Sequence, residues 1–209
     1  MKMKFLAAVG MMSAAFSAHA APTLSYAAGV SGLQAGDTLI ADFDTTNGGV
    51  VTTGNAFVTS GSVPGQYAAP GLNNMTNYLA IQSGGSASFA ITGLFNKLSF
   101  DVGSVDLFNK VTVITLIGST GTTYSFQGQQ LANAANGNQT SSATNGRLSI
   151  LGGAGETFTG LTLTSTGNSF EVDNIAGSVP EPASWAMMVG GFGMLGGMMR
   201  RNRVKVAMV

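Results

Sequence analysis

Short runs of β-branched and aromatic residues alternate with clusters of Gly, Asn and Ser from Thr38 onward. Within the runs, apolar and polar side chains alternate with a period of two, so that Leu98 and Phe100 share one side and Ser99 and Asp101 the other. No 3.6-residue period is sustained, and the pattern therefore predicts half-buried strands. The predicted strands span residues 38–43, 55–59, 78–82, 87–92, 97–102, 111–117, 122–126, 147–151, 158–165 and 169–175.

Strands of this number and length predict an all-β fold, an antiparallel two-sheet sandwich of jelly-roll type in which the N- and C-terminal strands can pair. Residues 128–145 are rich in Asn, Gln, Ala and Ser. This composition predicts a long loop, with room for one helical turn at 129–135. The sandwich body is expected to span residues 21–179.

Residues 1–20 have the pattern of a secretion signal that is removed from the mature protein. Lys2 and Lys4 provide the positive start, and residues 5–18 carry no charge. The triplet Ala18-His19-Ala20 fits the small-x-small cleavage rule, so Ala21 would begin the mature protein. We expect export through the Sec translocon and cleavage by signal peptidase. A retained membrane anchor is the weaker alternative, because the apolar run is short and no charge follows to stop transfer.

Residues 180–209 combine a Pro-Glu-Pro motif at 180–182, an uncharged run at 183–199 and a basic cluster at 200–205. A helix over the uncharged run would be about 26 Å long, close to the roughly 30 Å hydrocarbon layer. We therefore expect a transmembrane helix at about 183–199, with Trp185 at the outer interface and the basic cluster in the cytoplasm. Five glycines in the run weaken such a helix and indicate a temporary anchor. The alternative is a helix-packing face, since Gly193 and Gly197 form a GxxxG pair.

Charge is sparse and uneven along the chain. All nine acidic residues fall between Asp37 and Glu181, where only Lys97, Lys110 and Arg147 are basic, giving this region a net charge of −6. A nucleic-acid partner is excluded by this balance, because phosphate binding needs a basic patch.

The mature body contains neither histidine nor cysteine, because the only histidine, His19, lies in the predicted signal. This excludes Ser-His-Asp and Cys-His catalysis and the usual zinc sites. Glycan hydrolysis by two carboxylates remains open, at a separation of about 5 Å for retention or roughly 6.5–9.5 Å for inversion. We assign no catalytic residue and predict a non-enzymatic protein.

Four carboxylates form a candidate calcium site: Asp42 and Asp44 near the first predicted strand, and Glu171 and Asp173 near the last. Each pair is spaced i, i+2 and so points to one face of its strand. Their oxygens, with backbone carbonyls, could bind one Ca²⁺, which takes six to eight oxygen ligands. The favoured alternative is that they are solvated edge charges or turn caps, and no other cofactor is expected.

Asp106, Phe108 and Asn109 form a candidate glycan-binding set, because sugar recognition combines an aromatic face with directed hydrogen bonds. The favoured alternative is a turn, with Asn109 setting the backbone and Phe108 buried. The only tryptophan, Trp185, lies in the C-terminal helix, so the body has no indole platform for a sugar.

The C-terminal segment closely resembles the PEP-CTERM sorting signal in its PEPxxWA form. The resemblance is carried by Pro180, Glu181, Pro182, Trp185 and Ala186, followed by Arg200, Arg201 and Arg203. It implies processing by an exosortase, a membrane-embedded cysteine protease of Gram-negative bacteria that make extracellular polysaccharide.

The body resembles exosortase-dependent surface proteins of unassigned role. The resemblance is carried by Asp42-Phe43-Asp44, Tyr78-Leu79, the central 102–109 stretch, which is similar to a GSxDxYN pattern, and 169–174. It implies a location and a sandwich fold rather than a reaction.

Together these observations predict a precursor anchored in the inner membrane with its body in the periplasm, released to the cell surface or extracellular matrix. The expected function is a structural or adhesive component of the surface or biofilm polysaccharide matrix. The alternatives are a carbohydrate-binding module and, less favoured, a carboxylate-dependent glycan hydrolase.

Overall fold

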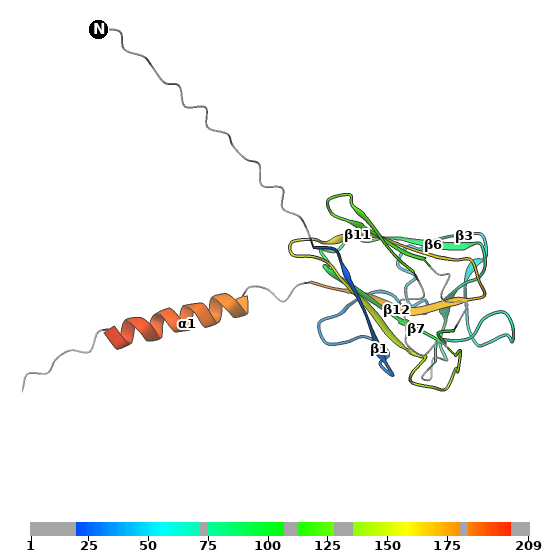
Figure 1. Ribbon diagram of the computed structural model, residues 1–209, viewed down its shortest axis with the longest axis horizontal. Helices are drawn as coiled ribbons and strands as arrows, with labels where there is room; N and C mark the ends of the chain where they lie inside the picture. The colour runs from blue at the N-terminus through cyan, green and yellow to red at the C-terminus, as the bar shows by residue number, and fades with distance from the viewer. Residues whose placement is uncertain (1–19, 72–74, 107–112, 128–135, 180–183, 202–209) are drawn as a thin grey trace, which may run out of the picture.

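A computed structural model describes residues 20–71, 75–106, 113–127, 136–179 and 184–201. Two antiparallel β-sheets face each other to form a sandwich (Figure 1). The larger sheet has the order β1 (Thr23–Ala28), β10 (Gly146–Leu151), β7 (Lys97–Val102), β12 (Phe170–Ser178), β5 (Tyr78–Ile81) and β4 (Ala56–Thr59), with β2 (Thr38–Ala41) also paired to β12. The smaller sheet has the order β3 (Val51–Thr53), β6 (Gly85–Ala90), β11 (Phe158–Ser165), β8 (Val113–Gly118) and β9 (Thr123–Gln127).

All ten predicted strands are present, and the sandwich is confirmed. The first predicted strand, β2, pairs with the last, β12, as expected from the sequence. Two strands were missed: β1, which lies at an edge and has no buried residue, and β3, which has three residues, all exposed. Residues 136–145 form turns and bends, which confirms this part of the predicted loop. The possible helical turn at 129–135 and the signal segment at 1–19 lie outside the described residues.

The core lies between the sheets and is built by the predicted alternation. Leu98 and Phe100 of β7 and Phe170 of β12 point inward and meet Leu116 and Leu161 of the smaller sheet. The rings of Phe100 and Phe170 pack edge to face, with centroids 6.5 Å apart. Burial of such side chains contributes roughly 1.5–3 kcal/mol each and is the main stabilisation of the sandwich.

The outer face of the larger sheet carries a buried polar network, although a polar outer face was expected to be solvated. Arg147 of β10 lies beside Asp101 of β7, with Nη1 donating to Oδ1 over 2.7 Å. Its Nη2 donates to Asp37 Oδ2 over 3.1 Å and to Ser99 Oγ over 2.9 Å. The backbone nitrogen of Gly32 also donates to Asp101, so the segment between β1 and β2 is fastened across this face. We name Arg147, Asp37, Asp101 and Ser99 the clasp.

A helix is present at the C-terminal end, as predicted. α1 spans Ser184–Arg201, and the described side chains from 189 to 197 are all exposed. Within the described part of the chain, however, no helix is both long enough and apolar enough to cross a membrane. The transmembrane helix predicted at about 183–199 is thus not found there, and the 18 residues of α1 include five glycines and two terminal arginines.

Candidate functional site: a polar pocket at the end of the larger sheet

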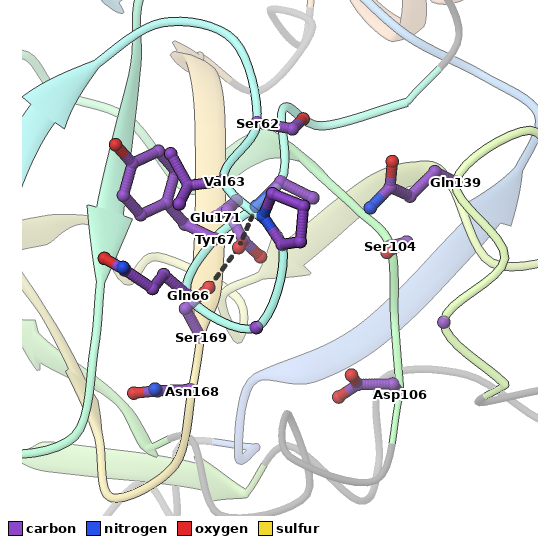
Figure 2. A pocket seen from close by; sticks show the side chains of 14 residues that line it. Ser62, Val63, Gln66, Tyr67, Ser104, Asp106, Gln139, Asn168, Ser169 and Glu171 are labelled. Atoms are coloured by element: carbon purple, nitrogen blue, oxygen red, sulfur yellow. Dashed lines mark hydrogen bonds between the residues drawn. The ribbon is translucent and has the colours of Figure 1, made fainter.

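A cavity of about 500 Å³ opens where β7 ends and β12 begins (Figure 2). The antiparallel register pairs Val102, the last residue of β7, with Val172 of β12. The residues that follow Val102 therefore lie beside the residues that precede Val172. The segment between β4 and β5 and the loop before β10 complete the wall. The lining residues are Ser62, Val63, Pro64, Gly65, Gln66, Tyr67, Ala68, Ser104, Asp106, Gly137, Gln139, Asn168, Ser169 and Glu171.

One wall of the pocket is a tight turn that the sequence specifies locally. The amide of Gln66 donates to the carbonyl of Val63 over 3.0 Å, which closes a four-residue turn around Pro64 and Gly65. Proline at the second position and a glycine with φ of 75° at the third are the requirements of a type II turn. Backbone hydrogen bonds between Val63 and Tyr67 extend the turn into a small hairpin and fix the Tyr67 ring beside the pocket.

The opposite wall is held by Asn145 and the loop before β10. Asn145 Oδ1 accepts from the amide of Gly71 over 2.9 Å, and Nδ2 donates to the carbonyls of Asn138 and Ser141. The amide of Gly137 donates to the carbonyl of Val105, which ties this loop to the segment after β7. Because Asn145 is fully buried and bonded on both sides, this wall is fixed to the body of the protein.

Glu171 is the buried acid of the pocket, with 4% of its surface exposed. Its Oε1 accepts from the amide of Ala68 over 2.9 Å and from the hydroxyl of Ser169. Burial raises the pKa of Glu171 from its ordinary 4.5 to about 7, and the charge of Asp106 adds to this; the hydrogen bonds from Ser169 and Ala68 act in the opposite direction. Near neutral pH the carboxyl group therefore exists in both forms and can donate as well as accept a hydrogen bond.

A buried tyrosine lies next to this acid. The Tyr78 hydroxyl donates to the carbonyl of Gly61 over 2.5 Å. Burial raises the pKa of Tyr78 above its usual range, and the charge of Glu171 adds to the shift. Tyr78 thus stays a neutral donor at all physiological pH values and connects the hairpin segment to β5.

Figure 2 shows Ser104, Asp106 and Gln139 on one side of Glu171 and Gln66 and Asn168 on the other. Among the described residues, the lining offers hydroxyls, amides, two carboxyl groups and the ring of Tyr67, and contains no Lys, Arg or His. Such a lining can form directed hydrogen bonds to a polar ligand and an apolar contact to one ring face.

One of the three candidate glycan-binding residues predicted from the sequence lines this pocket. Asp106 lies in the pocket, together with Glu171, which the sequence had suggested as a metal ligand. Phe108 and Asn109 lie outside the described residues.

The four candidate calcium ligands are not brought together. Asp42 accepts from the amides of residues 44–46 and from the Thr45 hydroxyl, and that hydroxyl is the first cause of its pKa falling to about 2. Asp44 accepts from the amide of residue 77, and Asp173 from Asn174. β5 occupies the edge of β12 beside Glu171, so β2 and its carboxylates meet β12 farther along. Among the described residues, no three acidic, histidine or cysteine side chains form a metal-binding group, contrary to the arrangement that the calcium hypothesis requires.

The structure describes only some residues of the predicted signal-cleavage site and of the sorting signal. Ala20 and Ala21 are exposed, directly before β1. Trp185, Ala186, Arg200 and Arg201 lie on α1. Ala18, Pro180, Glu181, Pro182 and Arg203 lie outside the described residues. Cleavage at Ala20–Ala21 stays a prediction.

Several residues of the pocket and the clasp were missed from the sequence. The Pro64-Gly65 pair is a local turn signal that could have marked the hairpin. Gln139 and the partners of Arg147 carry no such signal, because only long-range strand pairing brings them into place.

Comparison with solved structures gives distant similarities. The K2 cleaved adhesin domain of Lys-gingipain is 16% identical, with 70% of this chain and all of that chain covered and a TM-score of 0.44. The Agl-KA catalytic domain is 12% identical, with 75% and 30% covered and a TM-score of 0.38. The family 22 carbohydrate-binding module of Clostridium thermocellum Xyn10B is 12% identical, with 70% and 94% covered and a TM-score of 0.35. No curated protein matches the chain.

Residues 178–203 match the family described as the PEP-CTERM protein-sorting motif. The match begins at the last residue of β12 and runs through α1. It confirms the resemblance drawn from the sequence, and the chain carries a PEP-CTERM sorting motif in its C-terminal segment.

Proposed function

We propose that this chain is an exported exosortase substrate whose β-sandwich acts at the cell surface or in the polysaccharide matrix as a non-enzymatic, glycan-binding adhesive protein. The sorting motif at 178–203 supports the destination. The observation that supports the activity is the polar pocket of about 500 Å³ at the end of the larger sheet. A jelly-roll arrangement of the sandwich and transfer through the Sec translocon belong to the same proposal.

The proposed route uses both ends of the chain. Signal peptidase removes residues 1–20 during export, and the body folds in the periplasm. The exosortase then acts near residues 180–182 at the inner membrane and frees the body from the C-terminal signal. Since β12 ends at Ser178, this cut would leave every strand of the sandwich intact.

The pocket chemistry suits a saccharide. Its volume lies within the roughly 300–1,000 Å³ of small-molecule sites. Exposed amides of Gln66, Asn168 and Gln139 can each donate and accept, as sugar hydroxyls require. The ring of Tyr67 is held edge to face against Phe57, with centroids 5.5 Å apart, and offers an apolar surface at the same site.

A binding test uses the mature exported protein and a panel of neutral oligosaccharides. Native protein should bind at least one of them, and a Gln66→Ala/Gln139→Ala double variant should bind at least tenfold more weakly. Gln34→Ala is the matched control, because Gln34 is exposed and lies outside the pocket lining. Failure of every saccharide to bind, or equal binding by the double variant, would refute the proposed function.

A second candidate, glycan hydrolysis, is favoured by one observation: two carboxyl groups, Asp106 and Glu171, share the pocket. A hydrolase uses one acid that stays protonated near pH 7, which the raised pKa of Glu171 would allow. Burial of Glu171 against Ala68 and Ser169 makes binding the better proposal. Release of new reducing ends, lost in both Asp106→Asn and Glu171→Gln, would instead establish the hydrolase.

A further inference from the structure

The edge strand β1 presents one side of its backbone to solvent. Among the described residues its neighbouring strand is β10 alone, and β1 is longer than β4, β3 and β9, the strands at the other sheet margins. From its geometry we infer that two copies of this chain pair through β1, antiparallel and about a two-fold axis at Ser25, to form a dimer with one continuous larger sheet. This inference goes beyond the proposed function and does not depend on it.

The register with β10 shows which backbone groups of β1 point outward. In antiparallel pairing the amide and carbonyl of one residue point to the same side, and successive residues alternate. The amide of Gly29 donates to the carbonyl of Asn145 over 2.8 Å, and the pairing continues from there to Thr23 without a bulge. The odd-numbered residues of β1 therefore bond to β10, whereas Leu24 and Tyr26 direct their amides and carbonyls away from the sheet.

β1 lacks the features that usually protect an edge strand. Residues 23–28 contain no charged residue and no proline, and no bulge twists the strand away from a neighbour. The predicted cleavage between Ala20 and Ala21 would leave β1 at the start of the mature chain, with only two residues before it. A regular, uncharged edge of this kind is a template for pairing with another strand.

The edge is complementary to itself, which favours a second copy of this chain as the partner. A two-fold axis at Ser25 brings Leu24 opposite Tyr26 of the second copy, where their outward amides and carbonyls can bond to each other. The side chains of Leu24 and Tyr26 are half-buried against the core. Their contact across the axis would remove from water the apolar surface that is still exposed at this margin.

The smaller sheet presents a similar surface at the same margin. β3 contacts β4, so the opposite ends of the two sheets, β9 and β1, share the other side of the sandwich. Tyr124 and Phe126 of β9 are half-buried against the core, as Leu24 and Tyr26 are. Pairing through β1 would therefore bring two such margins together and cover apolar surface on both sheets.

The two-fold axis also places the two polar pockets at opposite ends of the dimer. In each copy Val102, at the pocket end of β7, pairs with Gly146, which in turn pairs with Ala28. Because the two β1 strands run antiparallel, Ala28 of one copy lies at the far end from Ala28 of the other. This consequence alone rests on the proposed function: two glycan-binding pockets so placed would cross-link separate polysaccharide chains.

Sedimentation velocity of the mature exported protein, measured over a dilution series, tests the dimer. We expect native protein to dimerise, and Ser25→Lys and Ser25→Glu each to weaken dimerisation at least tenfold, because each places two like charges opposite one another at the axis. An equimolar mixture of the two variants should restore the dimer, since opposite charges then face each other. Ser25 is exposed, so both variants should keep the native midpoint of urea unfolding.

Thr53→Lys is the matched control, because Thr53 is an exposed residue of β3 at the opposite margin of the sandwich and should leave dimerisation unchanged. Native protein that stays monomeric at every concentration, including one that pairs only with a different protein or with a polysaccharide, would overturn the inference. A dimer that Ser25→Lys leaves intact, or a mixture of the two folded variants that stays monomeric, would overturn it as well. Glycan binding by the pocket is measured separately and would stand or fall independently of these results.

Discussion

Replacing Arg147 by methionine should remove the cation of the clasp while keeping the length of its side chain. Arg147 is 2% exposed, and the side chains of its partners Asp37 and Asp101 are 1% and 8% exposed. The variant would remove the cation that Asp101 pairs with, leave Asp37 only the more distant Lys97, and take one partner from Ser99. We therefore expect the segment between β1 and β2 to detach from the outer face of the larger sheet.

The expected size of the effect follows from these contacts. Removing one partner of a buried ion pair costs about 3–5 kcal/mol, because an uncompensated charge remains. A domain of this size is stabilised by roughly 5–15 kcal/mol, so the variant would lose a large part of the total. With a urea m-value of about 2 kcal/mol/M, the unfolding midpoint should fall by about 2 M.

Urea unfolding followed by tyrosine fluorescence measures this loss. The matched control is Lys97→Met, because Lys97 is partly exposed and lies 3.9 Å from Asp37, a pair expected to contribute less than about 1 kcal/mol. If Arg147→Met costs no more than the control does, the clasp does not stabilise the fold and the reasoning fails.

Three further predictions concern the pocket acid, a turn and the core. Because the pKa of Glu171 rises from 4.5 to about 7 on folding, the folded chain keeps a proton that the unfolded chain releases, and stability should fall by up to about 3 kcal/mol as pH rises through this window. Glu171→Gln should flatten that slope in urea titrations; an unchanged slope would contradict the shift. Gly54→Ala should lower the melting temperature more than Gly61→Ala: both have positive φ, but a Cβ at Gly54 would lie 2.2 Å from the carbonyl oxygen of Gly84, whereas one at Gly61 meets open space. Equal melting temperatures would count against this. Phe158→Ala should cost about 3–5 kcal/mol by chemical denaturation, because Phe158 is fully buried, and a loss below about 1 kcal/mol would show that the core is not as described.

Local patterns were sufficient for ten of the twelve strands of the sandwich. Alternation in β7 and β12 correctly assigned Leu98, Phe100 and Phe170 to the inner face, since the two-residue period is a property of the strand itself. β3 was not predicted, because its three residues are all exposed and therefore show no alternation of apolar and polar side chains.

The pocket and the clasp depend on contacts between distant parts of the chain. Asp106 and Glu171 were each singled out from the sequence, yet only the register that pairs Val102 with Val172 places them in one cavity. Arg147 occupies an outer-face position, as alternation implies, but is buried because a separate segment carrying Asp37 covers it. No local signal could predict that cover.

The calcium hypothesis also depended on contacts between distant parts of the chain, which the sequence does not show. The spacing of Glu171 and Asp173 correctly placed both on one face of β12, but sequence could not show that β5 would occupy the strand edge beside Glu171. In the C-terminal segment, the order of the motifs identified the sorting signal, whereas no helix of the described residues is long and apolar enough to cross a membrane.

The most direct test of the account is the distribution of the native chain between the polysaccharide matrix and the growth medium, with the intact mass read from each fraction. The account predicts a chain that has lost residues 1–20 and its C-terminal signal, retained in the matrix, whereas the equally processed Gln66→Ala/Gln139→Ala variant is released into the medium. Native chain found in the cytosol with both ends still attached, or double variant retained in the matrix as fully as native protein, would contradict it.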